Sequence, residues 1–278
     1  MAADPLSTDG EGRADIVDLY GGLCDIENKI IKCVGEPRER FTEDALRILR
    51  CVRFATVLGF DVETDTFEAA KALAPRLEMV SAERKRVELE KTLLSDSADR
   101  GVELLLSANL PQYIHPEIRK NTVSLSTLPK IFAVRLAALL TDDRKPQLSA
   151  MKLSNEVKDN ASLLADNTFY LECRRRFGDD MSANARYMIA KYASLAPYAA
   201  QLRGDIEFSR LIQDEAKKSP AVTVAALKTN GNELLSLGIE AIKLGRIMTR
   251  LLIEVIRDPS LNTKESLSSL ALSLADEI

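Results

Sequence analysis

Charged residues recur at every third position of the segment EDALRILRCVRF, residues 43–54. The charged set is Asp44, Arg47, Arg50 and Arg53, and the apolar set is Leu46, Leu49, Val52 and Phe54. This pattern predicts one amphipathic helix. Because a three-residue step falls about 60° short of a full turn, the four charged residues would wind gradually around that helix. One carboxylate and three guanidinium forks suit a planar base and the phosphates of a nucleotide. The alternative is an ion pair with two solvated arginines.

Four further blocks accompany this segment in order along the chain. They are DLYGGLCDIENKIIKCVGEPRERF at 18–41, GF at 59–60, SAERKRVELEKTLLS at 81–95 and NGNELLSLGIEAIKLGRIMTRLLIEVIRDPSLNTKESL at 230–267. Together with residues 43–54 they resemble the bacterial class II tRNA nucleotidyltransferases, which are the CCA-adding enzymes and their poly(A) polymerase relatives. The resemblance runs over nearly the whole chain.

The resemblance implies roles for individual residues. Asp44 and Arg47 would read the base, Arg50 and Arg53 would also touch the nucleotide, and Glu43 would support them. The SAER block would brace the nucleotide-reading helix through Glu83 or Arg84. The block at 230–267 resembles the tail that grips tRNA, where Gly245 and Arg246 are the candidate RNA contacts.

The catalytic part of that family is missing from the sequence. Members carry a head domain with a Gly-Ser dipeptide and paired aspartates that hold two Mg²⁺ ions, whereas this chain has neither Gly-Ser nor Asp-x-Asp. The nearest imitations, Asp25 with Glu27 and Asp61 with Glu63, are interpreted as surface charges, because two-metal chemistry needs clustered carboxylates. We therefore expect a chain that begins partway through the head, has no catalytic or metal-binding residue, and is inactive alone. Mg²⁺ is expected only in the full-length enzyme.

Composition limits the remaining classes. The chain has 278 residues, of which 46% are hydrophobic and 29% charged, as in soluble globular proteins. Long apolar runs and a signal peptide are absent from the sequence, and four cysteines lack disulfide or metal spacing, so a cytoplasmic protein without membrane partners is expected. A single histidine excludes serine triads and histidine metal sites. The net charge of −4 argues mildly against nucleic acid, although local arginine clusters would still form a basic groove.

The expected fold is mainly α, an elongated multi-helix array with a short β and turn remnant of the head at its start. The expected parts are the end of the head (1–40), a neck with nucleotide-recognition helices (41–98), a body (99–200) and an RNA-binding tail (201–278). Strands are expected at 14–17 and 30–34, with a turn at Gly21-Gly22. Thr42 is expected to cap a helix that runs to about Leu58.

The resemblance implies that the chain binds the tRNA 3′ end, CTP and ATP, as the nucleotide-selecting and RNA-binding portion of a CCA-adding enzyme. The same portion of a poly(A) polymerase is the first alternative, and activities limited to CC or to A also stay open. A helical RNA-binding scaffold without catalysis is the third possibility. A homodimer is compatible with the sequence, which does not specify the oligomeric state.

Overall fold

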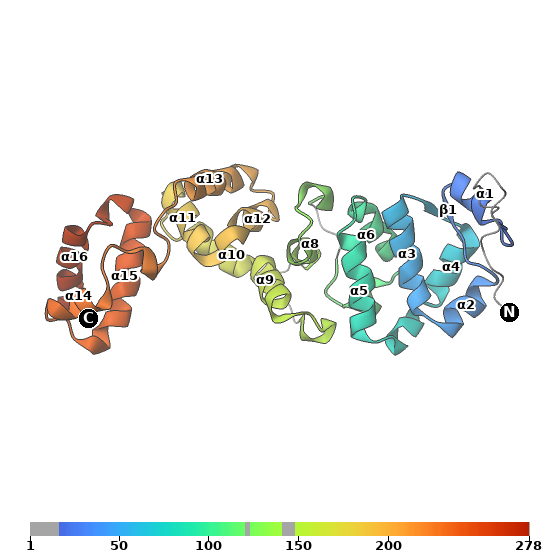
Figure 1. The fold of residues 1–278 in the computed structure, drawn as a ribbon, viewed down its shortest axis with the longest axis horizontal. Helices are drawn as coiled ribbons and strands as arrows, with labels where there is room; N and C mark the ends of the chain where they lie inside the picture. The colour runs from blue at the N-terminus through green and yellow to red at the C-terminus, as the bar shows by residue number, and fades with distance from the viewer. Residues whose placement is uncertain (1–16, 120–122, 141–147, 278) are drawn as a thin grey trace, which may run out of the picture. The chain divides into compact units, whose positions relative to one another are not determined.

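The computed structural model describes residues 17–119, 123–140 and 148–277, in which sixteen α-helices and one two-stranded sheet account for the regular structure (Figure 1). The expectation of a mainly α fold is therefore confirmed. The described residues divide into two compact units. The first comprises residues 17–119 with 148–153, and the second comprises residues 123–140 with 154–277. The four-part division into head end, neck, body and tail stays a prediction.

The first unit contains seven α-helices. They are α1 (Gly22–Glu27), α2 (Pro37–Glu43), α3 (Leu46–Leu58), α4 (Thr64–Ala72), α5 (Ala82–Leu93), α6 (Ala98–Ser107) and α7 (Pro111–Ile114). Short 3₁₀ segments occupy Ala74–Met79 and Leu148–Met151. The strands β1 (Ile30–Ile31) and β2 (Asp61–Val62) pair in parallel, with Ile30 opposite Asp61.

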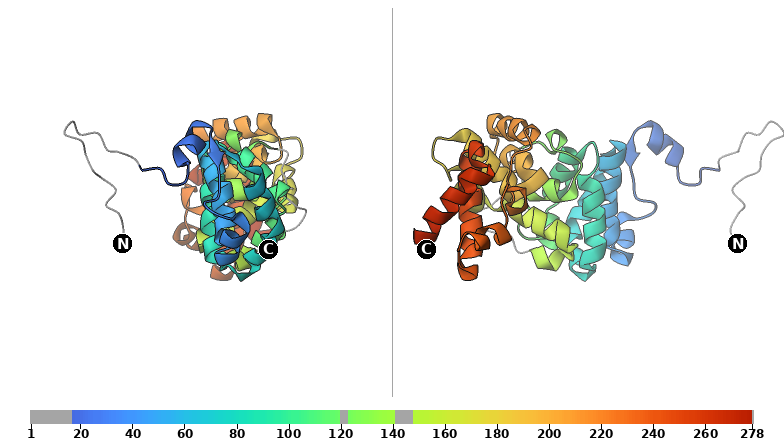
Figure 2. Two further views of the ribbon diagram at one scale, coloured as in Figure 1. Left: turned by 90° about the vertical axis from the view of Figure 1, so that its right-hand side faces the viewer. Right: turned by 60° about the vertical axis from the view of Figure 1, so that its left-hand side comes forward.

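Helix α3 lies at the centre of this unit. Ile48, Leu49, Val52 and Ala55 are almost completely buried, because their spacing places them on one side of a helix. That side packs against α5 and α6, and α3 and α5 also lie next to each other in the right-hand view of Figure 2. The helix ends at Gly59, whose φ of 67° forms a left-handed cap that glycine tolerates without strain. Burial on α3 thus determines which of its residues remain for binding.

Gly101 on α6 permits a close approach between three helices. A Cβ at this position would lie 2.5 Å from the Thr92 side chain on α5 and 2.8 Å from Thr56 Oγ1 on α3. We therefore expect Gly101→Ala to destabilise the protein by about 1–3 kcal/mol, the usual cost of overpacking. Thermal unfolding followed by circular dichroism measures this loss.

Gly245 provides the matched control for that substitution. It also lies in a helix, but a Cβ there meets no heavy atom within 4 Å. Gly245→Ala should leave stability unchanged or raise it by up to about 1 kcal/mol, since alanine is the better helix former. Equal melting temperatures for the two variants would contradict the packing argument.

The segment before α2 differs from its prediction. A helix, α1, occupies Gly22–Glu27, where a turn was expected, and the strand predicted at 14–17 lies almost wholly outside the described residues. Gly21 does adopt a positive φ of 75°. The Asp18 carboxylate accepts hydrogen bonds from the backbone N–H groups of Gly22 (2.8 Å) and Leu23 (2.9 Å). Through these bonds Asp18 caps the start of α1. The bonds from Leu23 and Gly22 also lower the pKa of the Asp18 carboxyl.

The second unit contains nine α-helices. They are α8 (Phe132–Ala138), α9 (Asn155–Ala165), α10 (Asn167–Arg174), α11 (Met181–Tyr192), α12 (Ala196–Gln201), α13 (Ile206–Lys217), α14 (Gly231–Ser236), α15 (Leu244–Arg257) and α16 (Lys264–Glu277). Five 3₁₀ segments connect them, at Leu125–Thr127, Ala193–Leu195, Val224–Ala226, Ala241–Lys243 and Pro259–Leu261. Asp166, Asp180 and Asp205 cap α10, α11 and α13 by accepting backbone hydrogen bonds. None of the helices in the described part of the chain is long and apolar enough to cross a membrane.

The last three helices enclose a separate apolar cluster, built mainly from one face of α15. Its central residues are Ile247, Leu251 and Val255, and Leu267 and Ala271 of α16 pack against them. Spacing of four residues along α15 places this face inward and leaves the arginines of the same helix outward. The core therefore orients the charged face of α15 toward solvent.

Candidate nucleotide-binding site

The segment 43–54 forms two helices rather than the single helix expected from its sequence. Asp44 ends α2 with extended backbone angles (φ −143°, ψ 101°), and α3 begins at Leu46. The Asp44 carboxylate accepts a hydrogen bond from the backbone N–H of Leu46 at 3.1 Å, and its carbonyl accepts one from the N–H of Arg47. Aspartate competes for such backbone donors and so favours the first position of a helix over its interior. Thr42 therefore does not cap α3, and Asp44, the first of the four charged residues, lies outside α3.

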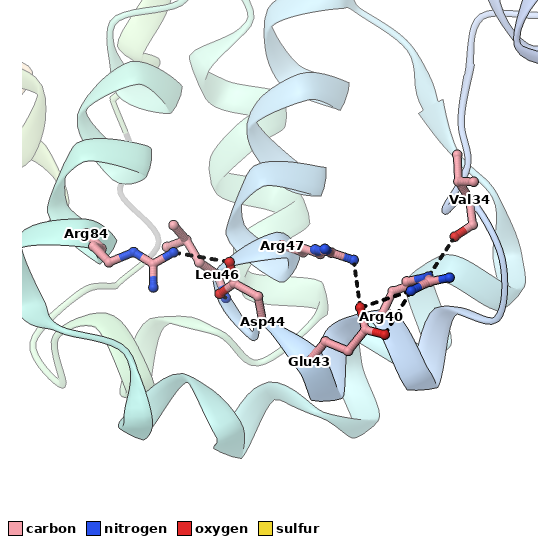
Figure 3. Close-up of polar contacts among 7 residues, drawn as sticks. All are labelled: Val34, Arg40, Glu43, Asp44, Leu46, Arg47 and Arg84. Atoms are coloured by element: carbon pink, nitrogen blue, oxygen red, sulfur yellow. Dashed lines mark hydrogen bonds and ion pairs between the residues drawn. The ribbon is translucent and has the colours of Figure 1, made fainter. Parts of the chain in front are cut away.

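The second carboxylate oxygen of Asp44 is bound by α5. Arg84 Nη2 donates to Asp44 Oδ2 at 3.1 Å (Figure 3), so the SAER block contacts the residue just before α3, and its support of nucleotide recognition stays a prediction. Ser81 caps α5 by accepting a hydrogen bond from the backbone N–H of Arg84. This bond fixes the backbone of the first turn, from which the Arg84 side chain extends. A carboxylate offers about four lone-pair directions, so Asp44 retains acceptor capacity for a ligand.

Arg47 is turned away from Asp44 in this structure. Its Nη1 donates to Glu43 Oε2 at 3.3 Å, and Arg40 Nη1 donates to the same carboxylate at 2.8 Å (Figure 3). Arg40 in turn donates to the carbonyl of Val34. Glu43 thus supports Arg47, whose side chain stays 43% exposed. Arg47 also keeps free N–H donors, because guanidinium has five.

Arg50 and Arg53 do not share one environment. Arg53 is only 14% exposed and donates to the buried Glu88 of α5 at 2.5 Å, with its guanidinium carbon 3.9 Å from the centroid of the Phe54 ring. Arg50 is half exposed and lies 3.9 Å from the other Glu88 oxygen. Arg53 is consequently directed to α5, whereas Arg50 is open to a ligand.

Arg47 and Arg50 line a common hollow of about 200 Å³ beside α3. The remaining lining residues are Ile31, Lys32, Cys33, Phe41, Cys51, Phe54 and Thr66. A second hollow of about 400 Å³ shares Lys32 and Cys33 with the first and extends toward α2 and α4. The structure thus brings two of the four predicted nucleotide-binding residues together at one hollow, while Asp44 and Arg53 lie outside its lining.

Comparison with known proteins adds independent evidence. Residues 59–121 match a family model described as the probable RNA and SrmB-binding site of polymerase A. The CCA-adding enzyme of Bacillus subtilis (strain 168) is 32% identical over 256 residues, which cover 85% of this chain and 61% of the relative. That of Streptococcus sanguinis (strain SK36) is 36% identical over 173 residues, covering 58% and 43%.

The fold agrees with these sequence matches. The crystal structure of the Bacillus stearothermophilus CCA-adding enzyme in complex with CTP superposes with a TM-score of 0.76 at 25% identity, covering 97% of this chain and 71% of that one. The chain belongs to the class II CCA-adding enzyme family. It corresponds to the C-terminal portion of these enzymes and spans between 43% and 61% of the two curated relatives above. The Thermotoga maritima CCA-adding enzyme complexed with tRNA shares the fold, with a TM-score of 0.68 at 18% identity.

The remaining predicted residues of this CCA-adding family member are placed as follows. Glu83 lies exposed in the first turn of α5, and Arg84 alone of this pair reaches Asp44. Gly245 and Arg246 lie exposed in the first turn of α15, and open space surrounds Gly245. Gly245 is therefore not required by internal packing.

Three residues of the site escaped the sequence analysis. Lys32 and Cys33 enter the hollow because β1 pairs with β2, and the N–H of Cys33 donates to Thr66 Oγ1 at 3.1 Å. Burial raises the pKa of the Cys33 thiol, although the positive charge of Arg47 acts in the opposite direction. The thiol is therefore uncharged where it lines the hollow. Arg40 was detectable in principle, since it precedes Glu43 by three residues.

Of the two carboxylate pairs noted in the sequence, Asp61 and Glu63 are engaged in other contacts, and Glu27 of the other pair is exposed. Asp61 pairs with Arg100, and Glu63 pairs with Lys32 at 3.0 Å and accepts from Thr66. Within residues 17–119, 123–140 and 148–277, no three His, Cys, Asp or Glu side chains gather in a group that could hold a metal ion. The described residues therefore do not fit the Mg²⁺ that the resemblance implies, and they are assigned no step in metal chemistry.

Proposed function

We propose that this chain supplies the nucleotide-selecting and RNA-binding portion of a tRNA CCA-adding nucleotidyltransferase, which extends tRNA 3′ ends from CTP and ATP. The observation that carries the proposal is the carboxylate of Asp44, held by Leu46 and Arg84 three residues before the exposed guanidinium of Arg47. Two solved relatives are complexes with CTP and with tRNA. Their transfer to this chain is part of the proposal.

Base chemistry explains why one acceptor and one donor fork select these nucleotides. Cytosine and adenine each present an exocyclic amino donor next to a ring-nitrogen acceptor, whereas guanine and uracil present a carbonyl next to a ring N–H. Asp44 would accept from the amino group and Arg47 would donate to the ring nitrogen. GTP and UTP would place acceptor against acceptor at Asp44 and leave polar groups unpaired, which is costly.

Nucleotide binding requires Arg47 to leave Glu43. The two residues form an exposed pair four residues apart, with Arg47 43% and Glu43 49% exposed. Such pairs contribute only about 0.3–0.5 kcal/mol, so a base can displace the contact at small cost. Arg50, half exposed at the hollow, would then bind the phosphates, and Arg53 would act mainly by positioning α3 on α5.

The catalytic step is assigned to the full-length enzyme, which would carry Mg²⁺ outside the described residues. This chain alone is expected not to incorporate labelled CTP or ATP into tRNA that lacks its 3′ CCA. A cytoplasmic location and a homodimer belong to the same proposal, and the free thiols of Cys24, Cys33, Cys51 and Cys173 fit a reducing compartment.

Isothermal titration of the four nucleotides tests base selection directly. The wild-type chain should bind CTP and ATP more tightly than GTP and UTP, and Asp44→Asn should lose this preference, because the amide no longer presents two acceptors. Asp159→Asn, an exposed change on α9, is the control and should keep the preference. Equal affinities of the wild type for all four nucleotides would overturn the assignment.

The poly(A) polymerase alternative predicts a different titration. The matching family model is described as a binding site of polymerase A, so a specific observation supports this alternative. A protein that binds ATP but not CTP would support it, whereas binding of both favours CCA addition.

A further inference from the structure

One segment of the first unit contacts the break between α2 and α3 (residues 44 and 45) from two sides. The segment comprises the 3₁₀ helix Ala74–Met79 and the start of α5. Arg84, in α5, donates to the carboxylate of Asp44 at 3.1 Å (Figure 3). Arg76, in the 3₁₀ helix, donates through Nη2 to the backbone carbonyl of Thr42, also at 3.1 Å. The segment therefore binds both the side chain of Asp44 and the backbone just before it.

The carbonyl of Thr42 lies where α2 runs out of internal donors. Helix α2 ends at Glu43, and the last four carbonyls of an α-helix have no partner within the helix. The extended conformation of Asp44 (φ −143°, ψ 101°) takes the chain away from the helix axis before it can supply further N–H groups. Arg76 supplies one of the missing donors, and its positive charge also suits the negative end of the helix dipole.

Arg76 extends from a well-packed support. Ala74 and Leu77 of the same 3₁₀ helix are 2% and 0% exposed, and this helix packs against α4 and α7. Pro75 restricts its backbone further, because the proline ring fixes φ. The backbone of Arg76 is therefore fixed within the first unit, and its hydrogen bond to Thr42 restrains the end of α2.

The surroundings of Arg76 do not favour it as a stabilising residue. Its Nε is buried and has no hydrogen-bond partner among the described residues. A buried donor without a partner destabilises a folded protein, whereas one hydrogen bond at an exposed carbonyl contributes little in return. Folding stability alone therefore does not explain an arginine at this position, and its contact with the backbone before Asp44 is the feature that remains to be explained.

We propose that Arg76 is a positioning residue for base selection, which holds the backbone at Thr42 so that the Asp44 carboxylate stays in place to accept from the base. The proposal rests on the function proposed above. Arg76 would touch no nucleotide and would act only through the backbone, since Asp44 lies outside both helices and is not restrained by their hydrogen bonds. An acceptor displaced from the amino group of cytosine or adenine leaves both groups unpaired, so small movements of Asp44 reduce selection.

Isothermal titration of the four nucleotides into the full chain tests this role. Arg76→Met removes every donor but keeps an unbranched side chain, and it should lower the preference for CTP and ATP by about two- to tenfold, as for one lost hydrogen bond. Its melting temperature should equal or exceed that of the wild type, because the unpaired Nε is removed. Arg76→Lys keeps one donor for the carbonyl and should retain more of the preference than Arg76→Met.

Arg86 provides the matched control. Its Nε is likewise buried without a hydrogen-bond partner among the described residues, but its Nη1 donates to Glu90 within α5 at 3.0 Å and not to the break. Arg86→Met therefore makes the same chemical change and should keep the wild-type preference. An equal loss of preference in Arg76→Met and Arg86→Met would overturn the proposal, because it would reflect the loss of positive charge in general.

Amide hydrogen exchange without nucleotide gives a second readout. The N–H of Leu46 donates to Asp44 Oδ1, so its exchange reports whether the break is held. It should exchange about two- to tenfold faster in Arg76→Met than in the wild type, and at the wild-type rate in Arg86→Met.

The two readouts separate this proposal from the proposed function. An unchanged exchange rate at Leu46 in Arg76→Met would overturn the role of Arg76, as would an unchanged preference in Arg76→Met when the wild type does select CTP and ATP. Equal affinities of the wild type for all four nucleotides would instead count against the proposed function.

Discussion

Replacing Arg47 by alanine is expected to reduce the preference for CTP and ATP over GTP and UTP by roughly 5- to 150-fold. A well-placed arginine or asparagine contact to a base edge discriminates by about 1–3 kcal/mol, and each 1.4 kcal/mol is a factor of ten. The Arg47 side chain is exposed and, among the described residues, pairs with Glu43, so its loss should not unfold α3. Affinity for tRNA should remain at the wild-type value, because the RNA-binding tail predicted at 201–278 belongs to the second unit.

The matched control for this variant is Arg38→Ala. Arg38 is an exposed arginine of α2 that lines the adjoining hollow and has the same charge. Nucleotide titration and tRNA anisotropy on both variants separate base reading from general attraction of phosphates. If Arg47→Ala weakened tRNA and nucleotide binding equally, or if Arg38→Ala erased the preference as strongly, Arg47 would not be the base-reading residue.

The helix pattern of this chain was readable from its sequence wherever apolar residues repeat at helical spacing. Helix α15, Leu244–Arg257, is an example, because its apolar stripe is long and uninterrupted. Ser81 caps α5 for a similarly local reason, since its hydroxyl accepts from a backbone donor three residues away. Such features need no information from distant parts of the chain.

The prediction of one helix over residues 43–54 was wrong because two local preferences competed. The apolar spacing of Leu46, Leu49 and Val52 continues smoothly, but the Asp44 side chain binds the N–H of Leu46 and stops α2. Periodicity alone cannot detect this break, since it ignores which side chain binds the backbone. The break matters for function, because it turns Asp44 toward Arg84 and away from Arg47 (Figure 3).

Contacts between distant residues set the rest of the site. Arg53 was grouped with the other nucleotide-binding arginines, but its partner Glu88 lies 35 residues further along the chain. The sequence likewise predicted a strand near Ile30 without its partner strand at Asp61, and that pairing is what brings Lys32 and Cys33 to the hollow. Tertiary packing therefore decides which of the three arginines stay open to a ligand.

The largest stability effect is expected from Arg186→Met, at about 3–5 kcal/mol, the cost of breaking a buried ion pair from one side. Arg186 on α11 is 7% exposed and joins three helices. It donates to Glu215 of α13 at 3.2 Å and to the carbonyls of Ile256 (2.6 Å) and Arg257 (2.7 Å), which end α15. Methionine fills a similar volume but leaves the buried carboxylate and both carbonyls without these donors. Chemical denaturation monitored by circular dichroism measures the change.

Two further substitutions show whether the fork, the charge or the volume of Arg186 matters. Arg186→Lys keeps the charge but cannot reach three acceptors in one plane, so it should recover only part of the loss. Arg210→Met makes the same chemical change at an exposed position of α13 and should stay within about 0.5 kcal/mol of wild type.

The charge of Glu215 explains why its donors matter. Burial raises the pKa of Glu215, but hydrogen bonds from Lys218 and Arg186 outweigh burial, and the net pKa is lowered. The carboxylate is therefore charged near neutral pH and needs these donors. A wild-type denaturation midpoint for Arg186→Met would mean that α15 is held by its apolar face alone.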